Sequence, residues 1–198
     1  MNLKYLGDAL DHWKGSLFEY LANAGVLRDF AVDPMASDLP EWTKADYALF
    51  ARLLRINEAQ LVRHQVTLRN RFEYFNEITH KGDLFLDPDT GIATGSVHTV
   101  EQYIRPQEVG FLLGEPANRL LGIYQHVRAQ RVSARVDDCL DKLKEEIGGF
   151  GWCSYESGTV AMIFLSRRVD RTNEVAAALK GLLGSHAERR IRFGERGR

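Results

Sequence analysis

The stretch Asp83-Leu84-Phe85-Leu86-Asp87-Pro88-Asp89-Thr90-Gly91 decides the fold class of this chain. A short apolar run ends in two acids that a proline separates, and a glycine follows. A buried parallel strand brings polar side chains to the carboxyl edge of an α/β sheet in this way, and such sheets hold their sites at that edge. The stretch therefore predicts a central buried strand, Leu84–Leu86, with a candidate site directly after it.

Helix and strand patterns alternate on both sides of this stretch. Apolar residues at three- and four-residue steps predict helices, and short apolar runs between turn signals predict strands. Helices are expected at 7–21, 43–55, 70–79, 106–114, 133–147 and 172–184. Strands are expected at 27–32, 61–68, 84–86, 120–124, 152–155, 159–165 and 191–193.

This alternation predicts an α/β fold over a single domain, residues 1–198. Helices that connect parallel strands cover both faces of the sheet, so we expect a three-layer α/β/α sandwich with a mostly parallel sheet. Ser157-Gly158 lies between the two late strands and predicts a C-terminal antiparallel hairpin. The order resembles the Rossmann-like sheet of methyltransferases.

The composition is that of an ordinary soluble globular protein, with 44% hydrophobic and 27% charged residues. No stretch approaches about 18 apolar residues, so we expect no membrane partner, and the cytoplasm is the default location. Cys139 and Cys153 fall on an apolar helix face and in a strand, which indicates buried thiols of a reducing compartment.

The net charge of −1 argues against a general nucleic-acid binder, but the C-terminal part is basic. Two interpretations stay open for its arginines, a solvated tail or a surface that binds nucleic-acid phosphates. These arginines are Arg167, Arg168, Arg171, Arg189, Arg190, Arg192, Arg196 and Arg198.

Three of the expected strands are followed by polar side chains. Asp33 follows the first, Asp87 and Asp89 follow the central one, and His126 and Arg128 follow the next. Because the carboxyl ends of parallel strands meet at one edge, these groups could converge. They could hold a divalent cation or position an amine or hydroxyl for proton transfer. The alternative is that the acids form turns and that backbone groups satisfy the histidine.

The first expected helix carries a polar face made of Asp8, Asp11, His12 and Lys14. A solvated helix surface would explain this face. The alternative is that the helix lies across the mouth of the site.

Three motifs together resemble a known group of proteins: Lys4-Tyr5-Leu6-Gly7-Asp8 with Asp11 and Lys14, then Phe85-Leu86-Asp87-Pro88-Asp89-Thr90-Gly91-Ile92, then Tyr124-Gln125-His126-Val127-Arg128. They are similar to a set of uncharacterised bacterial proteins of about this length. More distantly, they resemble Rossmann-fold adenine methyltransferases that act on ribosomal RNA, and three-Cys-motif partner proteins. In those families a helix with a conserved lysine precedes the first strand, and the fourth strand ends in Asp-Pro-Pro-Tyr.

The resemblance implies S-adenosylmethionine as the cofactor, with Asp33, Asp8 and Lys14 near it. It implies that Asp87 holds the acceptor amine, whereas an aromatic residue of the family motif stacks on the base. Here Asp89 and Thr90 replace the second proline and that aromatic. The loop after the first expected strand also lacks the glycine that would admit the methionine part of the cofactor.

Three functions are therefore expected. The first is a methyltransferase-like enzyme, or a degenerate derivative, that acts on nucleic acid, with Asp87, Asp89, His126 and Arg128 as its catalytic group. The second is a nuclease or phosphoesterase in which Asp33, Asp87 and Asp89 hold magnesium or manganese. The third is a non-catalytic binding module of a bacterial defence or mobile-element system. A homodimer is compatible with the aromatic residues Trp13, Trp42, Phe72 and Phe75, which at helical spacing are more often core.

Overall fold

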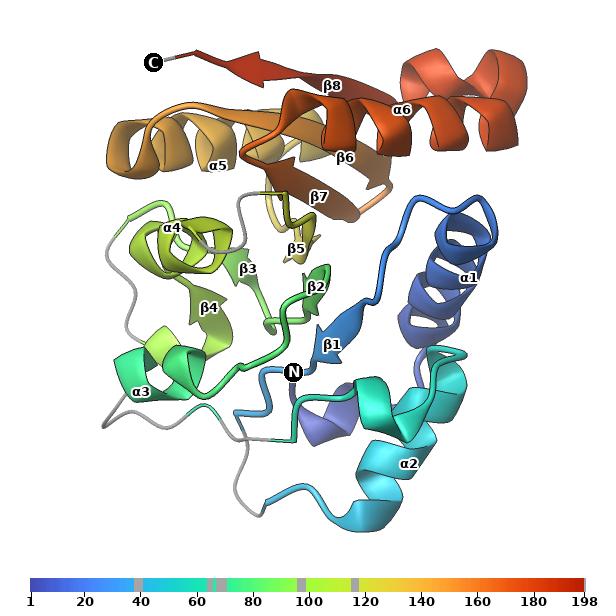
Figure 1. Ribbon diagram of the computed structural model, residues 1–198, viewed down its shortest axis with the longest axis vertical. Helices are drawn as coiled ribbons and strands as arrows, with labels where there is room; N and C mark the ends of the chain where they lie inside the picture. The colour runs from blue at the N-terminus through green and yellow to red at the C-terminus, as the bar shows by residue number, and fades with distance from the viewer. Residues whose placement is uncertain (38–40, 64–65, 67–70, 96–98, 115–117, 198) are drawn as a thin grey trace.

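A six-stranded sheet runs through the middle of the molecule in the order β1-β2-β5-β7-β6-β8 (Figure 1). The structure, a computed structural model, describes residues 1–37, 41–63, 66, 71–95, 99–114 and 118–197. The strands of the sheet are β1 (Ala31–Asp33), β2 (Leu84–Leu86), β5 (Leu121–His126), β6 (Phe150–Ser157), β7 (Val160–Ser166) and β8 (Ile191–Arg196). A separate parallel pair consists of β3 (Gly91–Ile92) and β4 (Tyr103–Ile104).

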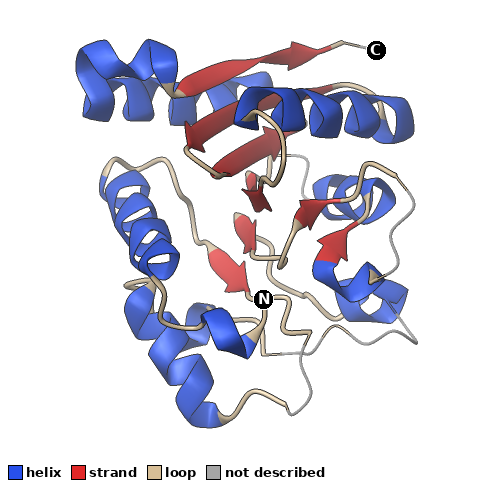
Figure 2. Cartoon of the chain, turned by 180° about the vertical axis from the view of Figure 1, so that it is seen from behind, coloured by secondary structure: helices blue, strands red, loops and turns tan. Residues whose placement is uncertain are grey.

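Helices cover both faces of the sheet, as Figure 2 shows from behind, so the expected α/β class is confirmed. One face packs against α1 (Ala9–Asn23), α2 (Lys44–Leu53) and α6 (Val169–Leu183). The other face packs against α3 (Arg71–Asn76), α4 (Pro106–Gly114) and α5 (Val132–Ile147). Four short 3-10 turns complete the described elements: η1 (Leu3–Tyr5), η2 (Glu58–Gln60), η3 (Val100–Gln102) and η4 (Gly184–Arg189).

The sheet has a parallel half and an antiparallel half. β1, β2 and β5 are parallel neighbours, whereas β7 is antiparallel to both β5 and β6. The expected hairpin is therefore present, with its second strand inserted between β5 and the first strand of the hairpin. β8 adds a further antiparallel strand at the edge. The carboxyl ends of β2 and β5 thus open on the same edge of the sheet.

Side-chain alternation along the strands builds two apolar cores. In β2 the Phe85 side chain belongs to the core under α1, α2 and α6, whereas Leu84 and Leu86 belong to the core under α3, α4 and α5. Successive residues of a strand point to opposite faces, and helices on both faces require every residue of the strand to be apolar. This is why the central strand reads as a continuous apolar run.

Several helix boundaries follow the sequence signals. The Asp8 side chain accepts hydrogen bonds from the first turn of α1, and Thr43 and Asp46 form a capping box on α2. Pro106 is the first residue of α4, as expected. Ser133 and Thr172, whose side chains are of the type that caps helices, were expected to cap the two helices that begin there, but neither residue caps α5 or α6. α5 begins at Val132 instead of after Ser133, and α6 begins at Val169.

At α6 the expected cap lies inside the helix. The Thr172 hydroxyl donates to the carbonyl of Val169 within the first turn, so it does not accept from the helix N-terminus. Phe72 of α3, expected in the core, is 68% exposed. Of the strand expected at 61–68, the described residues show a bridge between Leu61 and Val32 and a hydrogen bond from the N–H of Val66 to the carbonyl of Ala36. Residues 64–65 and 67–68 lie outside the described residues.

Asp83 fixes the amino ends of the parallel strands. One carboxylate oxygen accepts from the backbone N–H of Leu120 at 2.9 Å. The other accepts from the backbone N–H of Arg28 and from the buried guanidinium of Arg171, each at 2.7 Å. Arg28 precedes β1, Leu120 precedes β5 and Arg171 belongs to α6. The Asp83 carboxylate therefore binds three separate segments at the start of β2.

Both cysteines are buried, and burial raises the pKa of each thiol to about 12. Within the described part of the chain, no helix combines the length and the apolar character needed to cross a membrane.

We expect Asp83→Ala to lower the free energy of unfolding by about 3–5 kcal/mol, because Arg171 would keep a buried charge without its partner. Urea denaturation followed by circular dichroism measures the change. Asp170→Ala is the control: this side chain pairs with Arg168 at the surface, so we expect no measurable change. Equal stability of the two variants would refute the anchoring role of Asp83.

Candidate functional site

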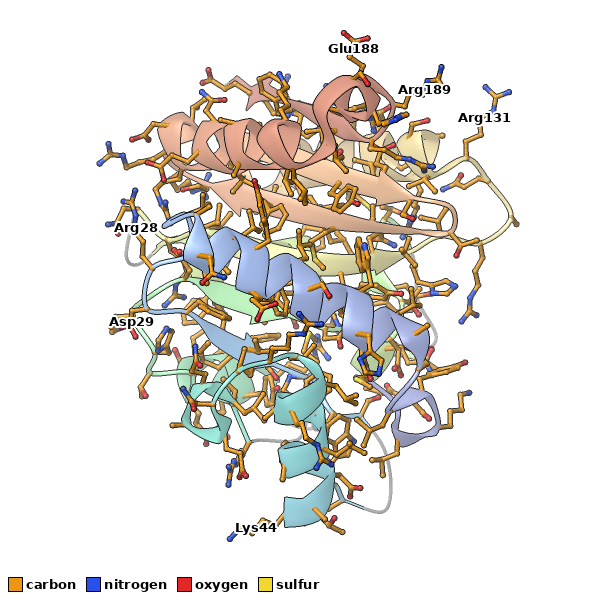
Figure 3. The ribbon with its side chains drawn as sticks, turned by 90° about the vertical axis from the view of Figure 1, so that its right-hand side faces the viewer. Arg28, Asp29, Lys44, Arg131, Glu188 and Arg189 are labelled. Carbon is orange, nitrogen blue, oxygen red and sulfur yellow. The ribbon has the colours of Figure 1, made fainter. Side chains whose placement is uncertain are left out.

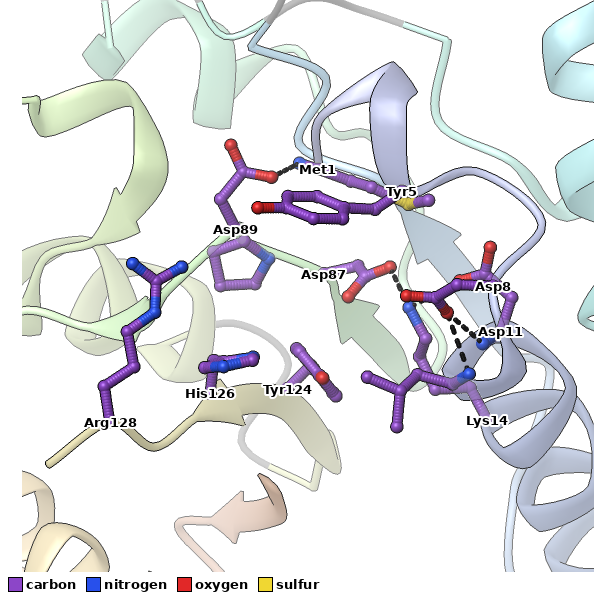
Figure 4. Close-up of a pocket in the computed structure, with 12 residues that line it drawn as sticks. Met1, Tyr5, Asp8, Asp11, Lys14, Asp87, Asp89, Tyr124, His126 and Arg128 are labelled. Atoms are coloured by element: carbon purple, nitrogen blue, oxygen red, sulfur yellow. Dashed lines mark hydrogen bonds and ion pairs between the residues drawn. The ribbon is translucent and has the colours of Figure 1, made fainter. Parts of the chain in front are cut away.

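A cavity of about 220 Å³ lies at the carboxyl ends of β2 and β5, where α1 and the segment before it cover the sheet edge (Figure 4). Its lining comes from three separated parts of the chain, the N-terminal segment with α1, the residues after β2, and the end of β5. The lining residues are Met1, Tyr5, Asp8, Leu10, Asp11, Lys14, Asp87, Pro88, Asp89, Tyr124, His126 and Arg128.

A buried ion pair connects α1 to the end of the central strand. Lys14 Nζ lies 2.6 Å from Asp87 Oδ2 and 2.8 Å from Asp11 Oδ1, and all three side chains are buried. Burial opposes the charged form of Lys14, but the two carboxylates outweigh that effect and raise its pKa. Burial raises the pKa of Asp87, with Lys14 opposing the shift. The Lys14 ammonium therefore compensates negative charge of Asp87 and Asp11, which together with Lys14 form the floor of the cavity.

Asp87 keeps one acceptor towards the cavity. Lys14 takes Oδ2, and no described residue donates a hydrogen bond to Oδ1. Tyr124 lies beside this pair, with the Lys14 ammonium 4.8 Å from its ring centroid. In Figure 4 the Tyr5 ring lies on one side of the Asp87 carboxylate, and Tyr124 and His126 lie on the other. A ligand that reaches Asp87 would therefore pass between aromatic side chains.

Asp89 lies farther along the same wall. Its Oδ2 accepts from the Ser37 hydroxyl at 3.1 Å, and its Oδ1 lies 3.7 Å from the amino group of Met1. That oxygen is buried and accepts no hydrogen bond from the described residues. The Met1 amino group donates instead to the carbonyls of Pro34 and Met35, each at 2.7 Å. Asp89 thus has an unused acceptor in the cavity wall.

His126 and Arg128 form the opposite end of the cavity. His126 is partly buried at the end of β5, and Arg128 is exposed. Burial lowers the pKa of His126 and the charge of Arg128 lowers it further, whereas Asp8 opposes the shift. The neutral imidazole is therefore the favoured form at neutral pH, with one donor and one acceptor nitrogen.

Asp33 does not line this cavity. It ends β1 beside the central strand, and its backbone carbonyl accepts from the N–H of Asp87 at 3.0 Å. Its carboxylate is bound elsewhere, by the Tyr74 hydroxyl at 2.6 and 2.8 Å and by the backbone N–H of Met35 at 2.7 Å. The backbone of Asp33 therefore lies next to Asp87, as expected. Its carboxylate does not join the other acids at the cavity, because it is bound by Tyr74 and Met35.

The structure brings together most of the side chains that the sequence singled out, and it adds others. Seven of the singled-out side chains line the cavity: Asp8, Asp11, Lys14, Asp87, Asp89, His126 and Arg128. Tyr5 and Tyr124 were not singled out. Tyr124 precedes His126 by two residues in a strand, so both point to the same face, and this spacing could have indicated it. No comparable sequence signal marks Tyr5.

The polar face of the first helix is not a simple solvated surface. Asp11 and Lys14 are 1% and 3% exposed, whereas His12 points to solvent. Asp11 and Lys14 therefore face the cavity that α1 covers, in agreement with the alternative interpretation of this helix.

Among the seven described arginines of the C-terminal part, four form ion pairs within the chain, namely Arg168, Arg171, Arg192 and Arg196. Arg192 binds Asp137 and Glu156, and Arg171 binds Asp83. Arg189 stays exposed and projects outward in Figure 3.

The methionine part of S-adenosylmethionine does not fit this arrangement. The loop after β1 is closed: Met35 and Ala36 are fully buried, and the carbonyls of Pro34 and Met35 are taken by Met1. Room for the whole cofactor would require Met1 to move.

A metal site receives little support from the side chains. Among the described residues, no group of three or more His, Cys, Asp or Glu side chains is positioned to hold a metal ion. The Lys14 ammonium also lies against Asp87, where a divalent cation would meet its charge.

No protein-family model, curated protein or solved structure matches this chain. The chemistry of the site is therefore derived from its own side chains.

We expect Lys14→Met to lower the free energy of unfolding by about 3–5 kcal/mol at pH 7, because Asp87 and Asp11 would be left buried without a counter-charge. The deficit should shrink as the pH falls. Without Lys14 the raised pKa of Asp87 rises further, so the folded variant binds a proton before the unfolded chain does, and acid stabilises it.

Urea denaturation at pH 7 and pH 5 tests this expectation. Lys44→Met changes an exposed lysine in the same way and should leave stability unchanged at both pH values. A deficit for Lys14→Met that stays constant or grows at the lower pH would contradict the ion-pair explanation.

A second expectation concerns the protonation of His126. Its pKa, followed by NMR as a function of pH, should lie below the ordinary value of 6.5. Arg128→Gln should raise this pKa because it removes a neighbouring positive charge, whereas Arg128→Lys should largely preserve it. An unchanged pKa in Arg128→Gln would show that the two side chains do not interact.

Proposed function

We propose that this chain is a methyltransferase-like Rossmann-fold protein that binds the amino group of a nucleobase at Asp87. The observation that carries the proposal is the unused Oδ1 acceptor of Asp87, held by the Lys14 contact to Oδ2 at the floor of the cavity. An exocyclic amine has N–H donors for such an acceptor. In the families that the sequence resembles, the aspartate at this strand end has the same partner.

The rings around Asp87 support a planar ligand. The motif Asp87-Pro88-Asp89-Thr90 lacks the aromatic that stacks on the base in the related motif. Tyr5 and Tyr124 lie on opposite sides of the Asp87 carboxylate and could supply that stacking surface from other parts of the chain (Figure 4). Stacking on aromatic side chains contributes about 1–3 kcal/mol per base.

Base binding is compatible with either an active enzyme or a degenerate derivative. Because the cofactor's methionine part has no room beside Met1, we derive no methyl-transfer step. The nuclease or phosphoesterase alternative has less support, since Lys14 already neutralises Asp87 and the Asp33 carboxylate is engaged by Tyr74. A binding module without turnover would use the same contacts.

The proposal predicts that the protein distinguishes adenosine from inosine, which carries an oxygen in place of the amino group. Adenosine should bind about tenfold tighter or more, because inosine would leave the Asp87 oxygen facing a second acceptor. Isothermal titration calorimetry measures both affinities. Asp87→Asn should remove the preference, because the amide can also donate to the inosine oxygen. Asp29→Asn, at an exposed position outside the cavity lining, should retain it.

Other outcomes discriminate between the candidate functions. Equal affinity for adenosine and inosine, or no binding of either, would refute base recognition at Asp87. Magnesium or manganese binding that Asp87→Asn abolishes would support the phosphoesterase alternative. Binding of S-adenosylmethionine would show that Met1 can leave the position it holds here.

A further inference from the structure

The guanidinium of Arg128 is a cation at the cavity mouth that has no counter-ion among the described residues. It lines the cavity and is exposed, yet it forms no ion pair or hydrogen bond with the described part of the chain. Other arginines of the later half are engaged internally, as Arg171 is by Asp83 and Arg192 is by Asp137. A guanidinium presents a planar set of donors that suits carboxylate or phosphate oxygens.

The backbone fixes where this arginine lies. On one side, the N–H of Val127 donates to the carbonyl of Thr159 at 2.7 Å, which ties the end of β5 to the hairpin. On the other side, Ala129 has φ = 59°, a left-handed conformation that is uncommon for a residue with a Cβ atom. Strained residues of this kind cluster at binding sites, where the surrounding structure maintains them. Arg128 is therefore held between two constrained residues.

His126 supplies a second donor at the same end. Its ring lines the cavity and makes no hydrogen bond with the described residues. In Figure 4 the imidazole and the Arg128 guanidinium lie together on one side of the cavity, away from Lys14 and Asp11. A neutral imidazole can donate one N–H to an anion while the guanidinium supplies the charge.

Three of the four acids that line the cavity lie beside a cation other than Arg128. Asp87 and Asp11 are paired with Lys14, and Asp89 lies beside the Met1 amino group. Asp8 accepts hydrogen bonds from the backbone N–H groups of Leu10 and Asp11 at the start of α1, where the helix dipole favours negative charge. Arg128 is therefore the cation that remains for a ligand.

We propose that His126 and Arg128 form an anion subsite that binds the phosphate of a nucleoside monophosphate, free or within a nucleic-acid strand. The inference rests on the proposed function, because the base at Asp87 orients the ligand. In this arrangement the Asp87 oxygen accepts from the amino group of the base, and the aromatic rings lie beside the base. Arg128 at the mouth of the cavity binds the phosphate, and the sugar lies between the two. The ligand is accordingly a nucleotide and not a free base.

Calorimetric titration of adenosine and adenosine monophosphate into the full chain tests the subsite. The monophosphate should bind about tenfold tighter or more, because the phosphate makes charge-assisted hydrogen bonds that adenosine lacks. Arg128→Gln should abolish this preference, so that the variant binds adenosine and its monophosphate with equal affinity. Arg131→Gln removes an exposed arginine three residues further on, outside the cavity lining, and should preserve the preference (Figure 3).

The same titrations separate the failure of each proposal. Equal affinity for adenosine and its monophosphate, with inosine still discriminated, would overturn the anion subsite and leave base recognition intact. A phosphate preference that survives Arg128→Gln would also overturn the subsite. No binding of any of these ligands would overturn both proposals. A short adenosine-containing single strand that binds tighter than the monophosphate, and loses this advantage in Arg128→Gln, supports the subsite with a nucleic-acid source.

Discussion

The buried contact between Lys14 and Asp87 is the interaction on which the site depends. It joins the first helix to the end of the central strand across 73 residues of sequence, at 2.6 Å. Two buried charges of opposite sign are stable only when they pair with each other and their remaining donors and acceptors form further hydrogen bonds. Asp11, one helical turn from Lys14, supplies the second carboxylate. The position of α1 over the sheet edge, and with it the cavity, follows from this requirement.

The same contact determines the electrostatics of the cavity. Lys14 compensates one of the two buried carboxylates that it contacts, and the other cavity-facing groups differ between the two sides of the cavity. Near Lys14 the cavity presents the unused oxygen of Asp87, whereas His126 and Arg128 lie together on the other side (Figure 4). A ligand with a donor and an anion at its opposite ends satisfies both. This polarity supports the proposed nucleotide ligand over a smaller or uncharged molecule.

The two halves of the sheet contribute differently to this arrangement. The parallel half, β1, β2 and β5, brings its carboxyl ends to one edge and thereby supplies the site. The antiparallel half supports it from the side. β7 pairs with β5 along its whole length, and the Thr159 carbonyl holds the residue after β5. Asp83 fixes the opposite ends of the parallel strands, so the site is built on strands constrained at both ends.

The sequence by itself determined the α/β class, the central strand Leu84–Leu86, the late hairpin and seven of the cavity residues, because strand periodicity, turn signals and polar side chains at strand ends and on a helix face are local patterns. Only the tertiary structure decided that Lys14 and Asp11 are buried and that Tyr5 reaches the cavity. It also decided that the Asp33 carboxylate binds Tyr74 instead of facing Asp87. These outcomes depend on which distant side chain satisfies a buried polar group. Packing between layers settles that choice, and no local spacing encodes it.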